Sequence, residues 1–189
     1  HNPAGNPRFP TLTHADYDSP AHHFHEAGSE GAECKNCHMV ERVYMGNDWR
    51  ADHSFRIPRP DLAAETGSPD ACTTCHTGET PEWAAATIAA WYPNSTHRGP
   101  HYGQVLAAGR ADPIGAMWDL AELSEDTAQP GIVRATALWL AAQGADAALA
   151  TRLEPLLSDP DPLVRASAIA VQRAAPPQAN RLGRGLPSA

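Results

Sequence analysis

A five-residue motif occurs twice in this sequence, and in each copy two cysteines are separated by two residues and followed at once by a histidine. The two copies read Cys34-Lys35-Asn36-Cys37-His38 and Cys72-Thr73-Thr74-Cys75-His76. These motifs contain all 4 cysteines of the chain, so none is left over for a structural disulfide or for a separate reactive thiol. Each motif therefore offers two thiols and one imidazole to a single group.

Such a motif is an attachment site for c-type haem, because its two thiols reach the two vinyl groups of one porphyrin and the next imidazole meets the iron. We therefore expect two covalently bound c-type haems as cofactors. A four-cysteine zinc site is the alternative, for which the gap between Cys37 and Cys72 is long but allowed. Haem is favoured because both cysteine pairs are followed by histidine. The attachment residues are Cys34, Cys37, Cys72 and Cys75, and the proximal ligands are His38 and His76.

The stretch from His22 to Tyr92 resembles a module of bacterial multihaem c-type cytochromes that also carry helical repeats. This resemblance implies electron transfer. It also implies a periplasmic or extracellular location with the signal peptide removed, since c-type haem is attached outside the cytoplasmic membrane. Larger relatives have more haem motifs, so the resemblance leaves open that the chain is a fragment or a reduced form.

The sixth iron ligand separates an electron carrier from an enzyme, because a filled axial position favours electron transfer and an open one permits substrate binding. In the relatives, histidines before and after a haem motif are distal ligands, which supports His25 first and also His53, without saying which iron each holds. Bis-histidine ligation also predicts low potentials. The full set of distal candidates is His22, His23, His25 and His53. Arg56 and Arg59 are candidate partners of haem propionates.

The composition argues against two classes of partner, nucleic acids and membranes. The net charge is −8 and Lys35 is the only lysine, so no basic stripe is available to follow a nucleic-acid backbone. No apolar stretch is long enough to predict a membrane span. The apolar fraction of 42% allows only a modest core, and two buried porphyrins would supply the remainder in the first half of the chain.

The expected fold is mainly α with much irregular loop. It consists of an extended arm over residues 1–20, a dihaem domain over 21–100, HEAT-like helical repeats over 101–175 and a patternless tail over 176–189. A helix over 81–91 is predicted, with Thr80 as its N-cap, a proline in the first turn and Pro93 beyond its end.

An internal repeat defines the second half. The run Ile132–Leu138 returns at Leu163–Ile169, 31 residues later, and the turn 159–162 precedes the second copy. Apolar residues at spacings of three and four predict one buried face on each copy. Segments 114–123 and 147–157 supply the other helices, and over residues 113–175 the pattern resembles HEAT repeats. The predicted buried residues are Val133, Ala137, Leu140, Ala141, Val164, Ala168 and Val171.

Three functions follow from these features. The first is electron transfer by a dihaem carrier whose partners are redox proteins or the haems of neighbouring copies. One version of it is a homo-oligomer or filament in which His14, His22 or His23 ligates a haem in the adjacent subunit. The second is a haem enzyme of the peroxidase or nitrogen-oxide reductase type with one open iron. The third is a haem-bearing module that docks a redox complex. Electron transfer is favoured because no acid-base cluster adjoins either motif.

Overall fold

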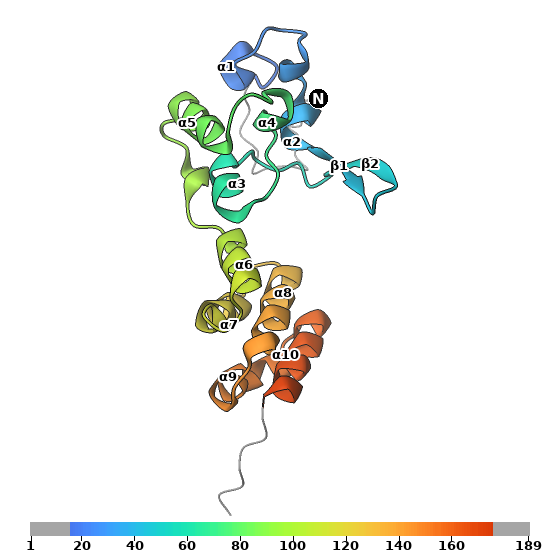
Figure 1. Ribbon diagram of the computed structural model, residues 1–189, viewed down its shortest axis with the longest axis vertical. Coiled ribbons are helices and arrows are strands. Elements are labelled where there is room, and N and C mark those ends of the chain that lie inside the picture. The colour runs from blue at the N-terminus through green and yellow to red at the C-terminus, as the bar shows by residue number, and fades with distance from the viewer. Residues whose placement is uncertain (1–15, 176–189) are drawn as a thin grey trace, which may run out of the picture. The chain divides into compact units, whose positions relative to one another are not determined.

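The computed structural model describes residues 16–175, and the chain divides into two compact units, residues 1–99 and 100–189. The described part is mainly helical with one two-stranded sheet (Figure 1), which confirms the expected mainly α fold. The expectations for the arm before residue 16 and for the tail lie outside the described residues. None of the helices in residues 16–175 is both long and apolar enough to cross a membrane.

The first unit is built from short elements separated by turns and loops. In chain order they are α1 Pro20–His23, η1 Glu30–Ala32, α2 Cys34–His38, β1 Glu41–Tyr44, β2 Asp48–Ala51, α3 Pro60–Thr66, α4 Cys72–Cys75, α5 Pro81–Trp91 and η2 Thr96–Arg98. Helix α5 has the predicted bounds, and the Thr80 side chain accepts a hydrogen bond from the Trp83 amide as its N-cap. Helix α3 packs against α5.

The first unit buries few apolar side chains. Its buried hydrophobic side chains in the described range are Pro60, Leu62, Ala63, Ala71 and Ala84, all from α3, α5 and the approach to α4. Helices α1 and α2 contribute no buried side chains. The polypeptide by itself therefore supplies too little core to hold the two motif helices and the loops around them.

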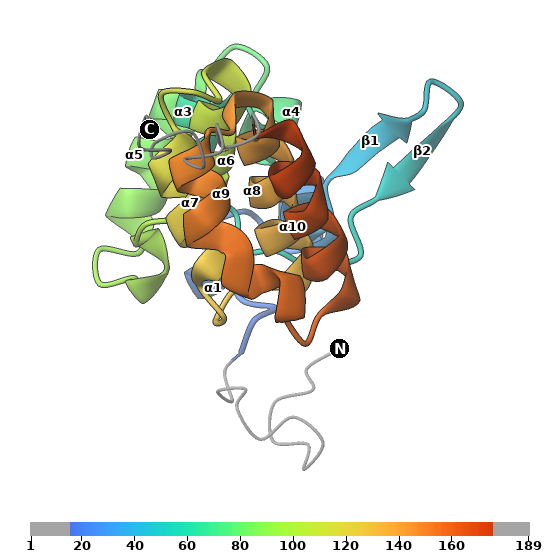
Figure 2. The same cartoon turned by 90° about the horizontal axis from the view of Figure 1, so that it is seen from below.

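The second unit has a continuous core of its own. Its elements are α6 Tyr102–Ala111, α7 Met117–Glu125, α8 Gly131–Ala141, η3 Ala142–Gly144, α9 Ala147–Leu153, η4 Glu154–Ser158 and α10 Pro162–Ala174. Figure 2 shows α8 and α10, the two copies of the repeat, side by side, and they pack closely. All seven residues predicted to form the buried faces of these two helices are buried, so that prediction is confirmed.

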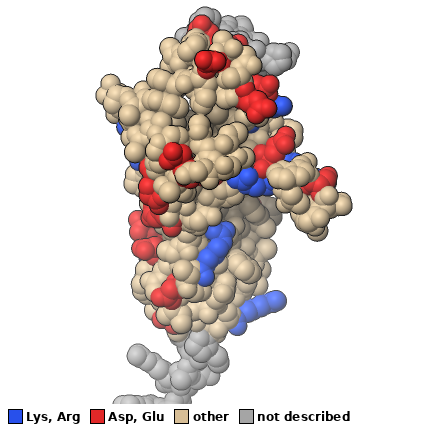
Figure 3. Space-filling model, turned by 45° about the horizontal axis from the view of Figure 1, so that its top comes forward, with Lys and Arg blue, Asp and Glu red and all other residues tan. Residues whose placement is uncertain are grey.

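Charged side chains are scattered over the surface. On the face drawn in Figure 3, Lys and Arg form separate small groups among Asp and Glu, in keeping with the net charge of −8.

The ion pair between Arg134 and Asp159 is buried in the second unit. Arg134 on α8 donates to both carboxylate oxygens of Asp159 at 3.3 and 2.6 Å and to the Ser124 carbonyl at 2.8 Å. This pair ties the turn before α10 to α7 and α8.

We predict that Asp159→Asn destabilises the second unit by about 3–5 kcal/mol, because it leaves the buried Arg134 guanidinium without its counter-charge. The matched control is Glu125→Gln, which breaks the half-exposed pair with Arg152 and should cost about 0.2–1 kcal/mol. Denaturant unfolding followed by far-ultraviolet circular dichroism measures both. Equal effects of the two variants would contradict the prediction.

The same pair predicts a pH dependence. The hydrogen bonds from Arg134 hold the pKa of Asp159 below its usual range. The charged carboxylate therefore stabilises the fold above the unfolded-state pKa of about 3.9, and this stabilisation is lost as the pH falls through the lowered folded-state pKa. Asp159→Asn should remove this part of the acid sensitivity, which acid titration of the two proteins measures.

Candidate functional site

The cysteines of the two motifs lie on the short helices α2 and α4, and the thiols of one helix influence those of the other electrostatically. Burial raises the pKa of Cys37, and the neighbouring thiols of Cys75 and Cys34 raise it further. Burial, together with the charges of Asp70 and Cys37, raises the pKa of Cys72 to about 11. Thiols of the two motifs therefore lie within electrostatic reach of one another.

The histidine of the first motif faces His22 from α1. The ring centroids of His22 and His38 are 6.2 Å apart, and their planes are nearly parallel, with an interplanar angle of 4°. Tyr92, at the end of α5, holds His22: its hydroxyl donates to the His22 carbonyl and lies 3.2 Å from Nδ1. Burial and the nearby His38 lower the pKa of His22.

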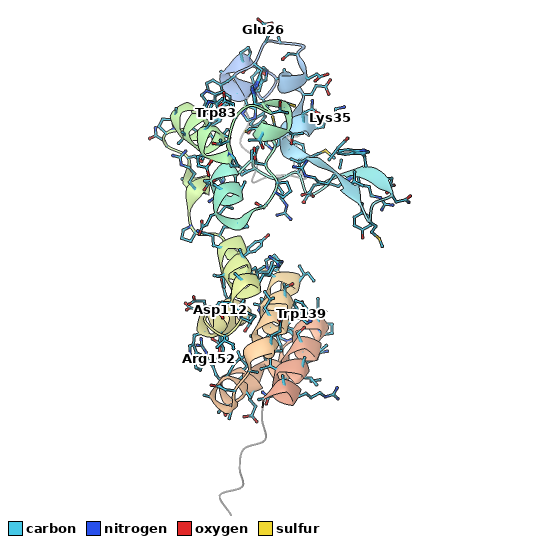
Figure 4. All side chains as sticks on the ribbon, viewed as in Figure 1. Glu26, Lys35, Trp83, Asp112, Trp139 and Arg152 are labelled. Atoms are coloured by element: carbon cyan, nitrogen blue, oxygen red, sulfur yellow. The ribbon has the colours of Figure 1, made fainter. Side chains whose placement is uncertain are left out.

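The histidine of the second motif faces His25. The centroids of His25 and His76 are 6.1 Å apart with an interplanar angle of 41°. Gly31 leaves room for His25, since a Cβ built on Gly31 would lie 2.2 Å from His25 Cδ2. Trp83 of α5, labelled in Figure 4, lies with its ring centroid 5.1 Å from that of His76. The Trp91 ring meets His25 edge-on at 6.0 Å.

These two spacings are those of imidazoles on opposite sides of one metal ion. An imidazole nitrogen lies about 2.0 Å from a bound first-row metal and about 1.1 Å from its own ring centroid, so two opposed rings have centroids about 6.3 Å apart. Ordinary aromatic pairs also occur at such distances, so the spacing needs support from the ring nitrogens.

The Nδ1 atoms supply that support. His38 Nδ1 donates to the Arg56 carbonyl at 2.7 Å, and His25 Nδ1 donates to the His23 carbonyl. The Tyr92 hydroxyl, having given its proton to the carbonyl, accepts from His22 Nδ1. In three of the four facing rings these contacts place the proton on Nδ1 and leave the Nε2 lone pair free, which is how protein partners orient a metal-binding histidine. The residues present therefore fit two six-coordinate irons.

The other two distal candidates do not face a motif histidine. His53 is exposed just after β2, where its Nδ1 donates to the Ala51 carbonyl at 2.8 Å. The His23 ring lies 6.5 Å from that of His25, and its carbonyl orients His25 as described above. The structure therefore brings together His22 and His25 with the motifs, and it gives His23 a positioning role.

Both arginines that the sequence pairs with propionates have protein partners. Arg56 pairs with Asp52 at 3.1 Å on the surface. Arg59 donates to both carboxylate oxygens of Asp61 and to the carbonyls of residues 97 and 99. Arg59 therefore fastens the segment after α5 to the start of α3. Sequence reasoning missed Phe55, whose ring stacks on His38 with centroids 4.7 Å apart.

In the described part of the chain, no group of three or more His, Cys, Asp or Glu side chains converges as it would around one metal ion held by protein ligands alone. The four-cysteine zinc alternative thus lacks a converged set of donors there. Comparisons with protein-family models, with curated proteins and with solved structures found no match.

Proposed function

We propose that the chain is a dihaem c-type cytochrome that transfers electrons. The first motif and His22 would hold one haem, and the second motif and His25 would hold the other. The observation that carries the proposal is the pair of opposed imidazoles, His22 with His38 at 6.2 Å and His25 with His76 at 6.1 Å. Both axial positions of each iron would be filled, which favours a carrier over an enzyme.

The meagre core of the first unit supports the same proposal. Within residues 16–99, the buried apolar side chains lie on α3, α5 and the approach to α4, and α1 and α2 have none. Small domains with too little core rely on disulfides, metals or bound groups. Two porphyrins attached beside α2 and α4 would provide that missing apolar surface.

When bound, haem iron supplies one-electron oxidation and reduction. The chain's own contribution is to hold the ligands in fixed positions. They would then need little rearrangement when the iron gains or loses an electron. The Arg56 carbonyl orients His38, Tyr92 orients His22, and the His23 carbonyl orients His25. Thiols of the two motifs influence one another electrostatically, so the two haems would be attached near each other, and electrons would pass between them and on to a redox partner protein.

The proposal places the protein in the periplasm or outside the cell, where c-type haem is attached. Both imidazole pairs come from one chain, so this arrangement requires no ligand from a neighbouring subunit. The version with ligation in trans by His22 would have to break the pair with His38. His14, the other candidate for ligation in trans, lies outside the described residues.

The test is a haem count by pyridine haemochrome together with visible and electron paramagnetic resonance spectra of the oxidised protein. We expect two c-type haems per chain, both low-spin. A high-spin signal from a substantial part of the iron would favour the enzyme alternative, and the absence of haem would overturn the proposal.

Gly31→Ala provides a test of the second site alone. The added Cβ would collide with the His25 ring, so we expect His25 to leave its place opposite His76 and about half of the iron to become high-spin. Gly78→Ala is the matched control, because a Cβ at Gly78 meets open space close to the same motif. An unchanged low-spin spectrum in Gly31→Ala would argue against His25 as a ligand.

A further inference from the structure

Among residues 16–99, no other helix or strand packs closely against the hairpin formed by β1 and β2. The hairpin extends away from the helices of the first unit in both Figure 1 and Figure 2. Its apolar side chains are exposed, with Trp49 at 68% and Met45 at 85% of their full exposure. An isolated two-stranded hairpin is marginally stable in water, and an uncovered strand edge is a template for further pairing.

The hydrogen-bond pattern shows what the free edge of β2 offers. The Asp52 amide donates to the Val40 carbonyl, so the pair 40/52 is a hydrogen-bonded pair. In the antiparallel register, Val43 lies opposite Trp49. Because hydrogen-bonded and non-hydrogen-bonded pairs alternate, Trp49 belongs to a non-hydrogen-bonded pair. Its amide and carbonyl therefore point away from β1, toward the free edge.

We propose that β2 of a second copy of this chain pairs with this edge, antiparallel, about a twofold axis at Trp49. Each Trp49 would then exchange two backbone hydrogen bonds with Trp49 of the second copy, giving a four-stranded sheet. The same register places Asp48 of each copy directly opposite Arg50 of the other copy, so the dimer would contain two such pairs. Opposite charges in directly opposed positions stabilise a sheet.

Charge complementarity selects this register and this partner. A twofold axis at Arg50 would set two arginines against each other, and one at Arg42 on β1 would do the same. Within one chain, Arg42 already lies opposite Arg50, and Asp48 pairs with Arg50 at 3.2 Å with both side chains at least half exposed. The Asp48 carboxylate of a second copy would offset the repulsion between these two arginines.

Sedimentation velocity of the purified full chain over a range of concentrations tests the dimer. We expect concentration-dependent self-association that is at least about tenfold weaker in Asp48→Arg and in Arg50→Asp, because each change opposes like charges twice. The double variant Asp48→Arg/Arg50→Asp restores opposite charges in the swapped sense and should restore association. This assembly does not depend on the proposed electron transfer.

Glu41→Arg is the control and should leave the association unchanged, since Glu41 lies on β1 opposite Ala51, away from the proposed edge and from the Asp48 and Arg50 pairs. All of these side chains are exposed, so far-ultraviolet circular dichroism should show unchanged helix content. A wild-type chain that stays monomeric at every concentration would overturn the proposal. So would a double variant that associates as weakly as the single variants.

Discussion

In His22→Gly, about half of the iron should change from low-spin to high-spin, because one of the two proposed haems would lose its sixth ligand. His22 faces His38 with ring centroids 6.2 Å apart, and Tyr92 holds it in that position. Glycine leaves a space in place of the ring, so added imidazole should enter it and restore the low-spin spectrum. Electron paramagnetic resonance and visible spectra, with and without imidazole, measure the change.

Companion variants separate the sites. His25→Gly should produce the same change at the second haem, and the double variant His22→Gly/His25→Gly should make nearly all of the iron high-spin. His53→Gly is the control, because His53 is exposed and hydrogen-bonded to the Ala51 carbonyl. A high-spin signal in His53→Gly but not in His22→Gly would refute the ligand pairs proposed above.

Features with a local physical cause could be predicted from the sequence. The helix over 81–91 follows from the Thr80 cap and the proline in its first turn. The buried faces of α8 and α10 follow from apolar spacing on a helix that packs on one side. The prediction of haem attachment also needs only local sequence, since each motif supplies two thiols and an imidazole within five residues.

The proposed pairing of His22 with His38 and of His25 with His76 depends on contacts that are remote in sequence. His22 and His25 are three residues apart, yet they face different motifs, because Phe24 has a positive φ of 57° and turns the chain between them. Neither this turn nor the contact between Tyr92 and His22 has a signal in the local pattern.

The hairpin has a local signal in the sequence. The segment Arg42-Val43-Tyr44 is followed by Gly46-Asn47 and then by Trp49, which is the composition of two short strands around a tight turn. Met45 and Gly46 both have positive φ, at 52° and 71°, as a tight hairpin turn requires.

Replacing both cysteines of one motif should remove one haem per chain. In Cys72→Ser/Cys75→Ser, the second haem has no thioether links, so pyridine haemochrome should fall from two haems to one. Cys34→Ser/Cys37→Ser should do the same for the first haem. The remaining haem should stay low-spin in each variant, because its own pair of imidazoles is untouched.

The same variants should weaken the first unit and spare the second. The first unit buries few apolar side chains of its own, whereas a continuous cluster across α6 to α10 holds the second unit together. Limited proteolysis should therefore cut within residues 16–99 much faster in the variants and leave a fragment containing α6 to α10 intact. If haem is lost while the first unit resists proteolysis as well as in the wild type, the porphyrins do not serve as its core, and its stability must come from the packing of α3 against α5.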